Sequence, residues 1–483
     1  MDCFFLKCNE VLKLADVPPE TKYFGGVSMT QNIILGGINE YGQDLLNEVS
    51  LMCINSDINI HMEQPSLSIR VHQGTNKEFL LKAIECIKDG AGKPAIFNDE
   101  IIIPALLEDG ASLEEARDYA IVGCVEPVAS NNTNGWTNAA MFNLAKCFEL
   151  ALNNGICPLS NTQIGPRTSE ACEFKSFKEF VIAYKKQVEY FVEQMVEILN
   201  ICEKIHGTIV PTPYVSILLD GCIDKGVDSS RGGAKYNYTG VQGIGLSNVV
   251  DSLIAVKKIV FEDKQLSLED FVQILNNNFD GNEYLRQKII NGIPKYGNNI
   301  KELDDLAKLA GLHYCNVVSK YKNNRDGKYR PGLFPVASHV PLGKVVGALP
   351  SGRLALTPLN DGISPVNGCD VNGPTAILQS VGNVEHIKAS NGTLLNIKLH
   401  PTALKTKEDF EKLRSLIMVF SELKLMHVQF NVVSKETLLD AQLHPENYKG
   451  LVVRVAGYSA NFVDLDSQMQ EDIIARTEHC VAY

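Results

Sequence analysis

Two short segments carry residues whose types and spacing suit radical and acid–base chemistry. The first reads Ala120-Ile-Val-Gly-Cys-Val-Glu-Pro127, with a cysteine at 124 and a carboxylate at 126. In an extended loop, residues two apart point the same way, so we expect Cys124 and Glu126 to face one substrate together. Pro127 has no backbone N–H, and we expect a strand to end here and a loop to begin.

The surroundings of Cys124 in the sequence are unfavourable for an ionic nucleophile. A carboxylate two residues away opposes thiolate formation, and no cation lies nearby in the sequence. The same pair suits a cysteine that carries a hydrogen atom beside a glutamate that acts as general base. The spacing alone also fits a buried cysteine at a strand end.

The second segment is RVAGYSANF at 454–462, which places a glycine at 457 after a strand-like run. The ordinary interpretation is a strand that ends in a glycine turn. Glycine also has no side chain, so its α-carbon can flatten and hold an unpaired electron between two amides. In that interpretation the protein supplies position and shielding for a radical at Gly457.

Taken together, the two segments resemble those of the glycyl radical enzyme family. RVAGYSANF is similar to the glycyl radical loop, GCVEP is similar to the cysteine loop of the eliminase branch, and the two occur in the family's order. The resemblance covers essentially all 483 residues. Further stretches that carry it are GGAKYN at 232–237, YRPGLFP at 329–335, DGISP at 361–365, SNGTLLN at 390–396 and HVQFN at 427–431.

The resemblance implies a role for three residues and a fold. Gly457 would store the radical, Cys124 would form a transient thiyl radical, and Glu126 would deprotonate a substrate hydroxyl. The implied fold is α/β, a ten-stranded α/β barrel of two antiparallel half-barrels, of which this chain is expected to supply the C-terminal part with both loops. We expect residues 1–350 to be the C-terminal part of a pyruvate formate-lyase-like catalytic domain, and residues 351–483 to be a glycine radical domain.

The implied activity is that of a radical lyase or dehydratase of anaerobic metabolism. The thiyl radical would take a hydrogen from a small hydroxylated substrate, and water or another neighbouring group would then leave. The pattern resembles diol and glycerol dehydratases, with choline, hydroxyproline and sulfonate lyases as close relatives. Two alternatives stay open: an acyl transferase resembling formate acetyltransferase, which the lack of a second adjacent cysteine disfavours, and a fragment that is active only with an N-terminal half.

Substrate contacts are expected further along the cysteine loop, at Trp136, Thr137 and Asn138. The dehydratases typically have His-Asp where this chain has Thr137-Asn138. That aspartate can help to protonate the leaving group, whereas an asparagine can exchange hydrogen bonds but cannot act as that acid. This departure puts the identity of the substrate in question.

The resemblance also implies partners. A radical S-adenosylmethionine activase, which carries its own iron–sulfur cluster, would install the glycyl radical, and no bound cofactor or metal is expected on this chain. We expect a homodimer or a pairing with an N-terminal half, because family chains carry a long region ahead of the matched part.

Composition excludes several classes of function. The net charge is −12 without a basic stripe, so a nucleic-acid partner is not expected. None of the 13 cysteines forms a CxxC pair, which disfavours a thiolate metal site and favours a reducing cytoplasm. The sequence has no run of about 18 apolar residues and no secretory pattern, so we expect neither a membrane span nor a leader.

Helical and strand-like stretches alternate with glycine-rich loops, which favours an α/β fold. Ser112 and Glu115 are typical of a capping box that opens a helix from Leu113 to Tyr119. Apolar residues three and four apart predict a long amphipathic helix from Phe177 to His206. Ser267 followed by Asp270 predicts the start of another helix, through Ile274, and Leu6–Leu14 is also predicted to be helical. Strands are predicted at Thr393–Leu399, Val428–Val433 and Leu451–Ala456.

The run Gly240-Val-Gln-Gly-Ile-Gly245 differs in spacing from a dinucleotide-binding GxGxxG motif, and no clear strand–turn–helix unit surrounds it. We interpret its glycines as points of close backbone packing.

Overall fold

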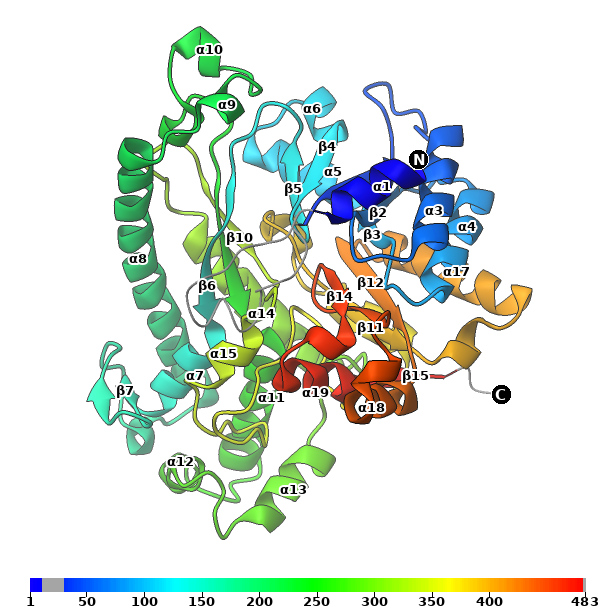
Figure 1. Cartoon of the computed structure of the whole chain (residues 1–483). Helices are drawn as coiled ribbons and strands as arrows, with labels where there is room; N and C mark the ends of the chain where they lie inside the picture. Colours follow the sequence, from blue (N-terminus) through cyan, green and yellow to red (C-terminus); the bar gives the residue numbers. More distant parts are fainter. Residues whose placement is uncertain (11–29, 481–483) are drawn as a thin grey trace. The chain divides into compact units, whose positions relative to one another are not determined.

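The computed structural model describes residues 1–10 and 30–480 (Figure 1). They form two compact units. The first unit comprises residues 1–130, 367–382 and 392–483, and the second comprises residues 131–366 and 383–391. These units divide the chain differently from the predicted sequence domains 1–350 and 351–483, which stay a prediction. Both chemistry-bearing loops belong to the first unit.

A six-stranded sheet forms the centre of the first unit. Its strands, in spatial order, are β1 (Asn32–Gly36), β2 (Ser66–Val71), β3 (Ala95–Asn98), β12 (His427–Val432), β11 (Asn396–Leu399) and β15 (Glu478–His479). The first three strands are parallel to one another, as are the last three, and the two sets meet antiparallel where β3 pairs with β12. The strands β2, β3, β11 and β12 are buried along their whole length, as expected for parallel strands covered on both faces.

Helices surround this sheet and connect its strands. They are α1 (Asp2–Asn9), α3 (Glu48–Ile60), α4 (Lys77–Lys88), α5 (Asp99–Asp109), α6 (Leu113–Arg117), α16 (Pro374–Val381), α17 (Lys407–Glu422), α18 (Lys435–Leu443) and α19 (Ser467–Ala475). Two hairpins complete the unit: β4 (Tyr119–Val122) with β5 (Glu126–Ala129), and β13 (Val452–Arg454) with β14 (Ser459–Asn461).

The second unit contains a three-stranded parallel sheet and a helical layer. The strands run in the order β10 (Tyr329–Gly332), β9 (Thr239–Ile244) and β6 (Trp136–Asn143). The main helices are α7 (Leu144–Leu152), α8 (Phe177–Ile209), α11 (Leu246–Val256), α12 (Leu268–Asn276), α13 (Glu283–Gly292), α14 (Lys301–Val318) and α15 (His339–Gly343). Short elements are α9 (Pro213–Ser216), α10 (Cys222–Lys225), β7 (Ile156–Cys157) and β8 (Thr162–Gln163). The described strands thus lie in one six-stranded sheet, one three-stranded sheet and three two-stranded pairs, which gives the α/β character predicted from the sequence, and the ten-stranded barrel stays a prediction.

Most predicted elements are present, with shifted ends. The long amphipathic helix is confirmed as α8, which buries Phe180, Tyr184 and Val188 along one face. The capping box of Ser112 and Glu115 is present, but α6 ends at Arg117. The predicted strands correspond to β11, β12 and β13, and the helix after Ser267 corresponds to α12. The predicted Leu6–Leu14 helix is described only as α1, because residues 11–14 lie outside the described residues.

The expectation that a strand ends at Pro127 is wrong. Pro127 lies inside β5 and pairs with Ile121 across the β4–β5 hairpin. The preceding strand ends earlier, at Val122. Proline is compatible with a strand whose free edge carries no ladder bond at that residue, and this two-stranded hairpin offers such an edge.

The glycines of the 240–245 run pack closely, as predicted. A side chain at Gly240 would overlap the backbone oxygen of Thr137 and the amide of Asn391, and one at Gly243 would lie 2.8 Å from the ring of Tyr314.

None of the helices within residues 1–10 and 30–480 combines the length and the apolar character that a membrane crossing requires.

Asp251 of α11 makes the stability of the second unit depend on pH. Burial raises the pKa of this carboxyl from 3.8 to about 6, against the opposing effects of Lys295 and of the Tyr296 N–H, which donates to Asp251 at 2.9 Å. The native state therefore binds more protons than the unfolded state between pH 3.8 and 6. The free energy of unfolding falls as pH rises through this window.

We expect Asp251→Asn to flatten that dependence and to raise the free energy of unfolding at pH 7 by roughly 1 to 3 kcal/mol. Both changes can be measured by urea unfolding at several pH values from 4 to 7, with circular dichroism as the signal. Asp280→Asn, at an exposed position of the same unit, is the matched control. An unchanged slope in the Asp251 variant would contradict the assignment.

Candidate active site

The cysteine lies in the turn of the β4–β5 hairpin. The last strand pair is Val122 with Glu126, and residues 123–125 form the connection. Gly123 has a φ of +61°, a conformation that residues with side chains adopt rarely. Cys124 follows it and is 7% exposed. The local sequence Gly-Cys-Val therefore places a nearly buried thiol at the tip of a two-stranded ribbon.

Glu126 binds the backbone of the cysteine turn. Its Oε2 accepts hydrogen bonds from the N–H groups of Cys124 at 2.8 Å and Val125 at 2.7 Å. The carboxylate is buried, and a side chain at Gly123 would lie 3.2 Å from its Oε1. The glutamate side chain thus lies in the same turn as the thiol. It folds back onto the backbone of the turn, whereas the sequence predicted that Cys124 and Glu126 point the same way along an extended loop.

The glycine lies at the tip of the β13–β14 hairpin. Arg454 pairs with Ser459, and the N–H of Val455 donates to the carbonyl of Tyr458 at 2.9 Å. Ala456 and Gly457 are therefore the two central residues of the turn. Gly457 has a φ of +92°, which is the conformation that favours glycine at the third position of a turn.

The two hairpin tips are in direct contact. A side chain at Gly457 would overlap Cβ of Cys124, and its first carbon would lie only 2.9 Å from Sγ. The hydrogen of Gly457 that occupies the side-chain position therefore points at Cys124. The proximity of Cys124 and Gly457, which the sequence supported only through resemblance, is a feature of the first unit. Gly392 packs against the turn that carries Cys124. The lack of a side chain at Gly392 makes this approach possible, because its first carbon would lie 2.8 Å from Val125 Cγ2.

Gln429 of β12 positions the turn that contains Gly457. Its Oε1 accepts from the N–H of Gly457 at 3.2 Å and from Nε of Arg454 at 2.9 Å. Its Nε2 donates to Asn396 Oδ1, and Asn396 Nδ2 donates to the carbonyl of Val455 at 3.2 Å. Gln429 and Asn396 are direct partners in the β11–β12 register. The side-chain amides of Gln429 and Asn396, on neighbouring parallel strands, therefore bind the glycine turn at Gly457 and at Val455.

Arg454 is anchored from several directions. Asn431 exchanges two hydrogen bonds with its backbone, at 2.8 and 2.7 Å. The guanidinium donates to the hydroxyls of Ser66 and Ser459. Ser459 in turn donates to the carbonyl of Ala91 at 3.0 Å. A buried guanidinium requires such partners, because an unpaired one carries a large desolvation penalty.

The fold supplies the cation that the sequence around Cys124 lacks. Burial lowers the pKa of Arg454 to about 10, while its interactions with Cys124 and Asp57 oppose that shift, so the guanidinium stays charged at neutral pH. Burial, with a further contribution from Arg454, holds the pKa of His427 well below its usual range. The thiol is therefore next to one permanent positive charge, and the imidazole of β12 stays neutral. The statement that no cation lies near Cys124 in the sequence stays correct, because Arg454 is brought to the thiol by the fold from 330 residues away.

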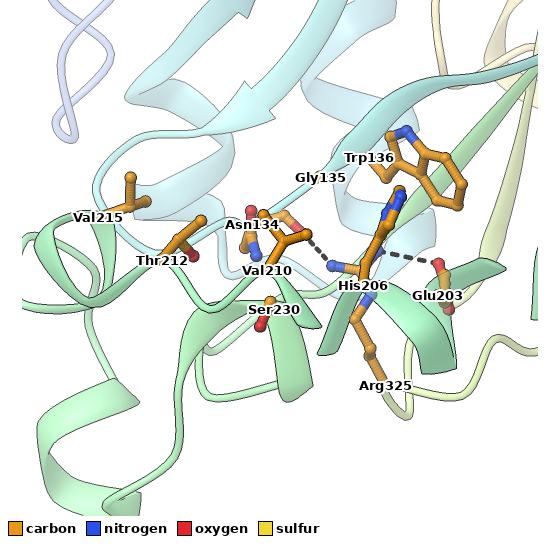
Figure 2. A pocket seen from close by; sticks show the side chains of 10 residues that line it. All are labelled: Asn134, Gly135, Trp136, Glu203, His206, Val210, Thr212, Val215, Ser230 and Arg325. Carbon is orange, nitrogen blue, oxygen red and sulfur yellow. Dashed lines mark hydrogen bonds and ion pairs between the residues drawn. The ribbon is translucent and has the colours of Figure 1, made fainter. Parts of the chain in front are cut away.

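Trp136, Thr137 and Asn138 lie on β6 in the second unit. The indole of Trp136 contacts the ring of His206, with centroids 5.1 Å apart, in a cavity of about 310 Å³ (Figure 2). Thr137 is buried, and its carbonyl accepts from Gln242 and Asn391, each at 2.7 Å. Asn138 is exposed. All three stay predicted substrate contacts.

One compact group of possible metal-ligand atoms occurs among residues 1–10 and 30–480. His400, Glu478 and Cys480 offer ligand atoms within 4.8 Å of one another. The carboxylate of Glu478 already has a cationic neighbour, because Nζ of Lys398 lies 3.4 Å away. Neither hairpin tip contributes to this group.

Comparison with known proteins agrees with the geometry. The family model described as pyruvate formate lyase-like matches residues 1–343, and the model described as glycine radical matches residues 359–463. The chain is 36% identical over 478 residues to trans-4-hydroxy-L-proline dehydratase of Clostridioides difficile, a match that covers 99% of this chain and 60% of that protein.

Solved structures give the same picture. The B12-independent glycerol dehydratase of Clostridium butyricum superposes with a TM-score of 0.97 at 48% identity, over 99% of this chain and 61% of that one. A structure from Roseburia inulinivorans, described for 1,2-propanediol dehydration, superposes with a TM-score of 0.96 at 44% identity. The match covers 99% of this chain and 61% of that one. The chain thus spans about three fifths of the length of these relatives. Its predicted place in their C-terminal part stays a prediction.

We expect Gly457→Ala to destabilise the first unit more than a backbone effect alone explains. Gly368→Ala is the matched control, because Gly368 has a φ of +78° but a side chain there would meet no other atom within 4 Å. The control should cost about 1 kcal/mol, and Gly457→Ala should cost about 1 to 3 kcal/mol more through overlap with Cys124. Equal losses in urea unfolding would show that the hairpin tips are not in contact.

Proposed function

Because the chain belongs to the pyruvate formate lyase-like family and carries its glycine radical region, we propose that it is the chemistry-bearing part of a glycyl radical lyase. The observation that carries the proposal is the contact between Gly457 and Cys124 at two buried hairpin tips. Hydrogen-atom transfer requires donor and acceptor atoms in direct contact, and it does not require a charged thiolate.

In the proposed reaction, a radical on the α-carbon of Gly457 takes the hydrogen atom from the thiol of Cys124. Gly457 regains its C–H bond, and the unpaired electron moves to Sγ. The thiyl radical then takes a hydrogen from the substrate carbon that bears a hydroxyl. Glu126 accepts the hydroxyl proton, and the group on the neighbouring carbon leaves. The thiol finally gives its hydrogen to the product radical and becomes a thiyl radical again. This thiyl radical takes the α-hydrogen of Gly457, which restores the S–H bond of Cys124 and the radical on Gly457.

The surroundings of both residues suit this chemistry. Two backbone N–H donors fix Oε2 of Glu126, which orients Oε1 as the proposed proton acceptor. Val125, Val455 and Ala456 are fully buried beside the two reactive residues, so water is excluded from them. We propose the activity for the sequence domains 1–350 and 351–483 acting together.

The proposed substrates are small hydroxylated molecules. Relatives are named for glycerol, 1,2-propanediol and trans-4-hydroxy-L-proline dehydration, which all remove a group next to a hydroxyl-bearing or heteroatom-bearing carbon. We propose Trp136, Thr137 and Asn138 as substrate contacts. Elimination of water or of a nitrogen- or sulfur-bearing group fits the same residues. A radical S-adenosylmethionine activase is the proposed source of the radical, with no cofactor bound to this chain, and the proposed assembly is a homodimer or a pairing with an N-terminal half.

Electron paramagnetic resonance tests the radical assignment. After anaerobic incubation with an activase and S-adenosylmethionine, we expect a glycyl doublet that Gly457→Ala abolishes. Cys124→Ser should keep the doublet and lose turnover, and Glu126→Gln should keep it with turnover lowered about 100-fold or more. Cys172→Ser, at an exposed cysteine, is the control and should change neither. After exposure to air, mass spectrometry should find chain cleavage at Gly457; an intact chain after proven activation would refute the proposal.

The predicted role of Asn138 is tested by restoring a carboxylate. We expect Asn138→Asp to raise turnover of glycerol or 1,2-propanediol at least tenfold, because the new side chain can protonate a leaving hydroxyl. The exposed Asn291→Asp is the control. If the two variants give the same rate in a coupled aldehyde assay, residue 138 does not contact the leaving group.

A further inference from the structure

Lys93 is a fully buried lysine between α4 and β3 of the first unit. None of its side chain is exposed. Its Nζ donates to Oδ1 of Asp57, to the carbonyl of Met62 at 2.8 Å and to the carbonyl of Pro65 at 3.3 Å. An ammonium group has three N–H donors, so all three have acceptors. Burial of this charge is tolerated because it is paired and hydrogen-bonded.

The loop that carries Lys93 contacts the β13–β14 hairpin. The carbonyl of Ala91 accepts from the hydroxyl of Ser459 at 3.0 Å. Gly92 has a φ of +68°, and a side chain there would overlap Cβ of Arg454. Arg454 and Ser459 are the strand pair that closes the glycine turn. The 91–93 loop therefore reaches the hairpin at both sides of this turn.

Lys93 also binds the connection between α3 and β2, because its two carbonyl partners lie on either side of Glu63. Oε1 of Glu63 accepts from the N–H of Asn461 at 2.9 Å, which fixes the second strand of the hairpin. Ser66, where β2 begins, accepts from the guanidinium of Arg454 at 3.1 Å. One buried ammonium thus joins the two loops that bind the hairpin through these groups.

Asp57 holds the ammonium from α3. The carboxylate is 3% exposed, and its Oδ2 accepts from the thiol of Cys86 at 3.3 Å, so both of its oxygens have donors. Burial lowers the pKa of Arg454 to about 10, and the charges of Cys124 and Asp57 oppose this shift. The ion pair of Lys93 and Asp57 is therefore close enough to act on the cation beside the thiol.

We propose that Lys93 is a positioning residue for the hydrogen-atom transfer between Gly457 and Cys124. Its ammonium joins α3, the α3–β2 connection and the 91–93 loop into one support for the β13–β14 hairpin. A role in stability alone would not require this charge, because uncharged replacements of a buried ion pair are often neutral. A displacement of about 1 Å at reacting groups can slow a reaction about 100-fold. The inference rests on the proposed radical function.

The test uses the full chain with the variants Lys93→Met and Lys93→Met/Asp57→Asn. The single variant leaves a buried carboxylate without its cation, whereas the double variant leaves no unpaired charge and should fold. Lys295→Met is the matched control. Lys295 is a buried lysine of the second unit that donates to the carbonyl of Ser351 at 3.1 Å and acts on a buried carboxyl group.

Hydrogen exchange measured by mass spectrometry tests the support without any radical. Both Lys93 variants should raise the exchange rate at least tenfold in peptides from residues 454–461. This segment contains the N–H groups of Gly457 and Asn461, which bind Gln429 and Glu63. Exchange in α17 should stay unchanged, and Lys295→Met should change neither region.

Turnover of activated protein tests the transfer step. In a coupled aldehyde assay with glycerol or 1,2-propanediol, both Lys93 variants should turn over at least tenfold more slowly per glycyl radical, as counted from the doublet. The solvent deuterium isotope effect on turnover should rise, because the thiol hydrogen exchanges with solvent and its transfer becomes slower. A merely structural role would reduce radical and turnover together and leave the isotope effect as in Lys295→Met.

The double variant decides between these roles. Exchange in residues 454–461 equal to that of the control would overturn the proposal, as would equal turnover per radical with an equal isotope effect. Failure of the double variant to fold would make the pair a requirement of stability and would also overturn it. If the unmutated chain shows no doublet after proven activation, the radical function fails and the role in transfer fails with it. Faster exchange in the Lys93 variants would separate that case from a failure of the support.

Discussion

The contact between Gly457 and Cys124 is the constraint on which the first unit depends. No side chain fits between the two hairpin tips, so each hairpin must be held to within a fraction of an ångström. The β11–β12 pairing achieves this on one side, because it places Asn396 and Gln429 next to each other beneath the glycine turn. Glu126 achieves it on the other side by binding the backbone of its own turn.

Such precision is achieved with buried polar groups rather than with apolar packing alone. Arg454 is fully buried, and its backbone and guanidinium are bound by Asn431, Gln429 and Ser459. A buried residue with several directional hydrogen bonds can adopt only a few geometries, whereas apolar contacts constrain direction less. The same network keeps a positive charge beside the thiol without an acidic partner in the turn itself. Arg454 and its hydrogen-bond partners therefore both hold the glycine turn in place and set the charge beside Cys124.

Local sequence patterns predicted most of the elements, and the family resemblance indicated Cys124 and Gly457, but neither predicted the residues that hold the two turns in place. The capping box at Ser112 and the periodicity of α8 depend on neighbours within a few residues, and both are confirmed. The role of Gln429 depends on the register between two strands and on a hairpin 28 residues later, which no local pattern encodes. The alternation of His427, Gln429 and Asn431 in an otherwise apolar strand was the available indication. Pro127 was misplaced because the partner strand of its hairpin was not foreseen.

The positive φ of Gly457 has a stereochemical consequence. Its two α-hydrogens are not equivalent, and the one in the position of an L-side chain, the pro-S hydrogen, is directed at Cys124. A planar glycyl centre held between the same two peptide groups presents one face to sulfur and the other to the protein behind it. In the proposed reaction, every hydrogen atom that the thiol transfers to Gly457 would therefore arrive on the same face. Glycine has no stereocentre, but at position 457 its surroundings make it behave as a chiral residue.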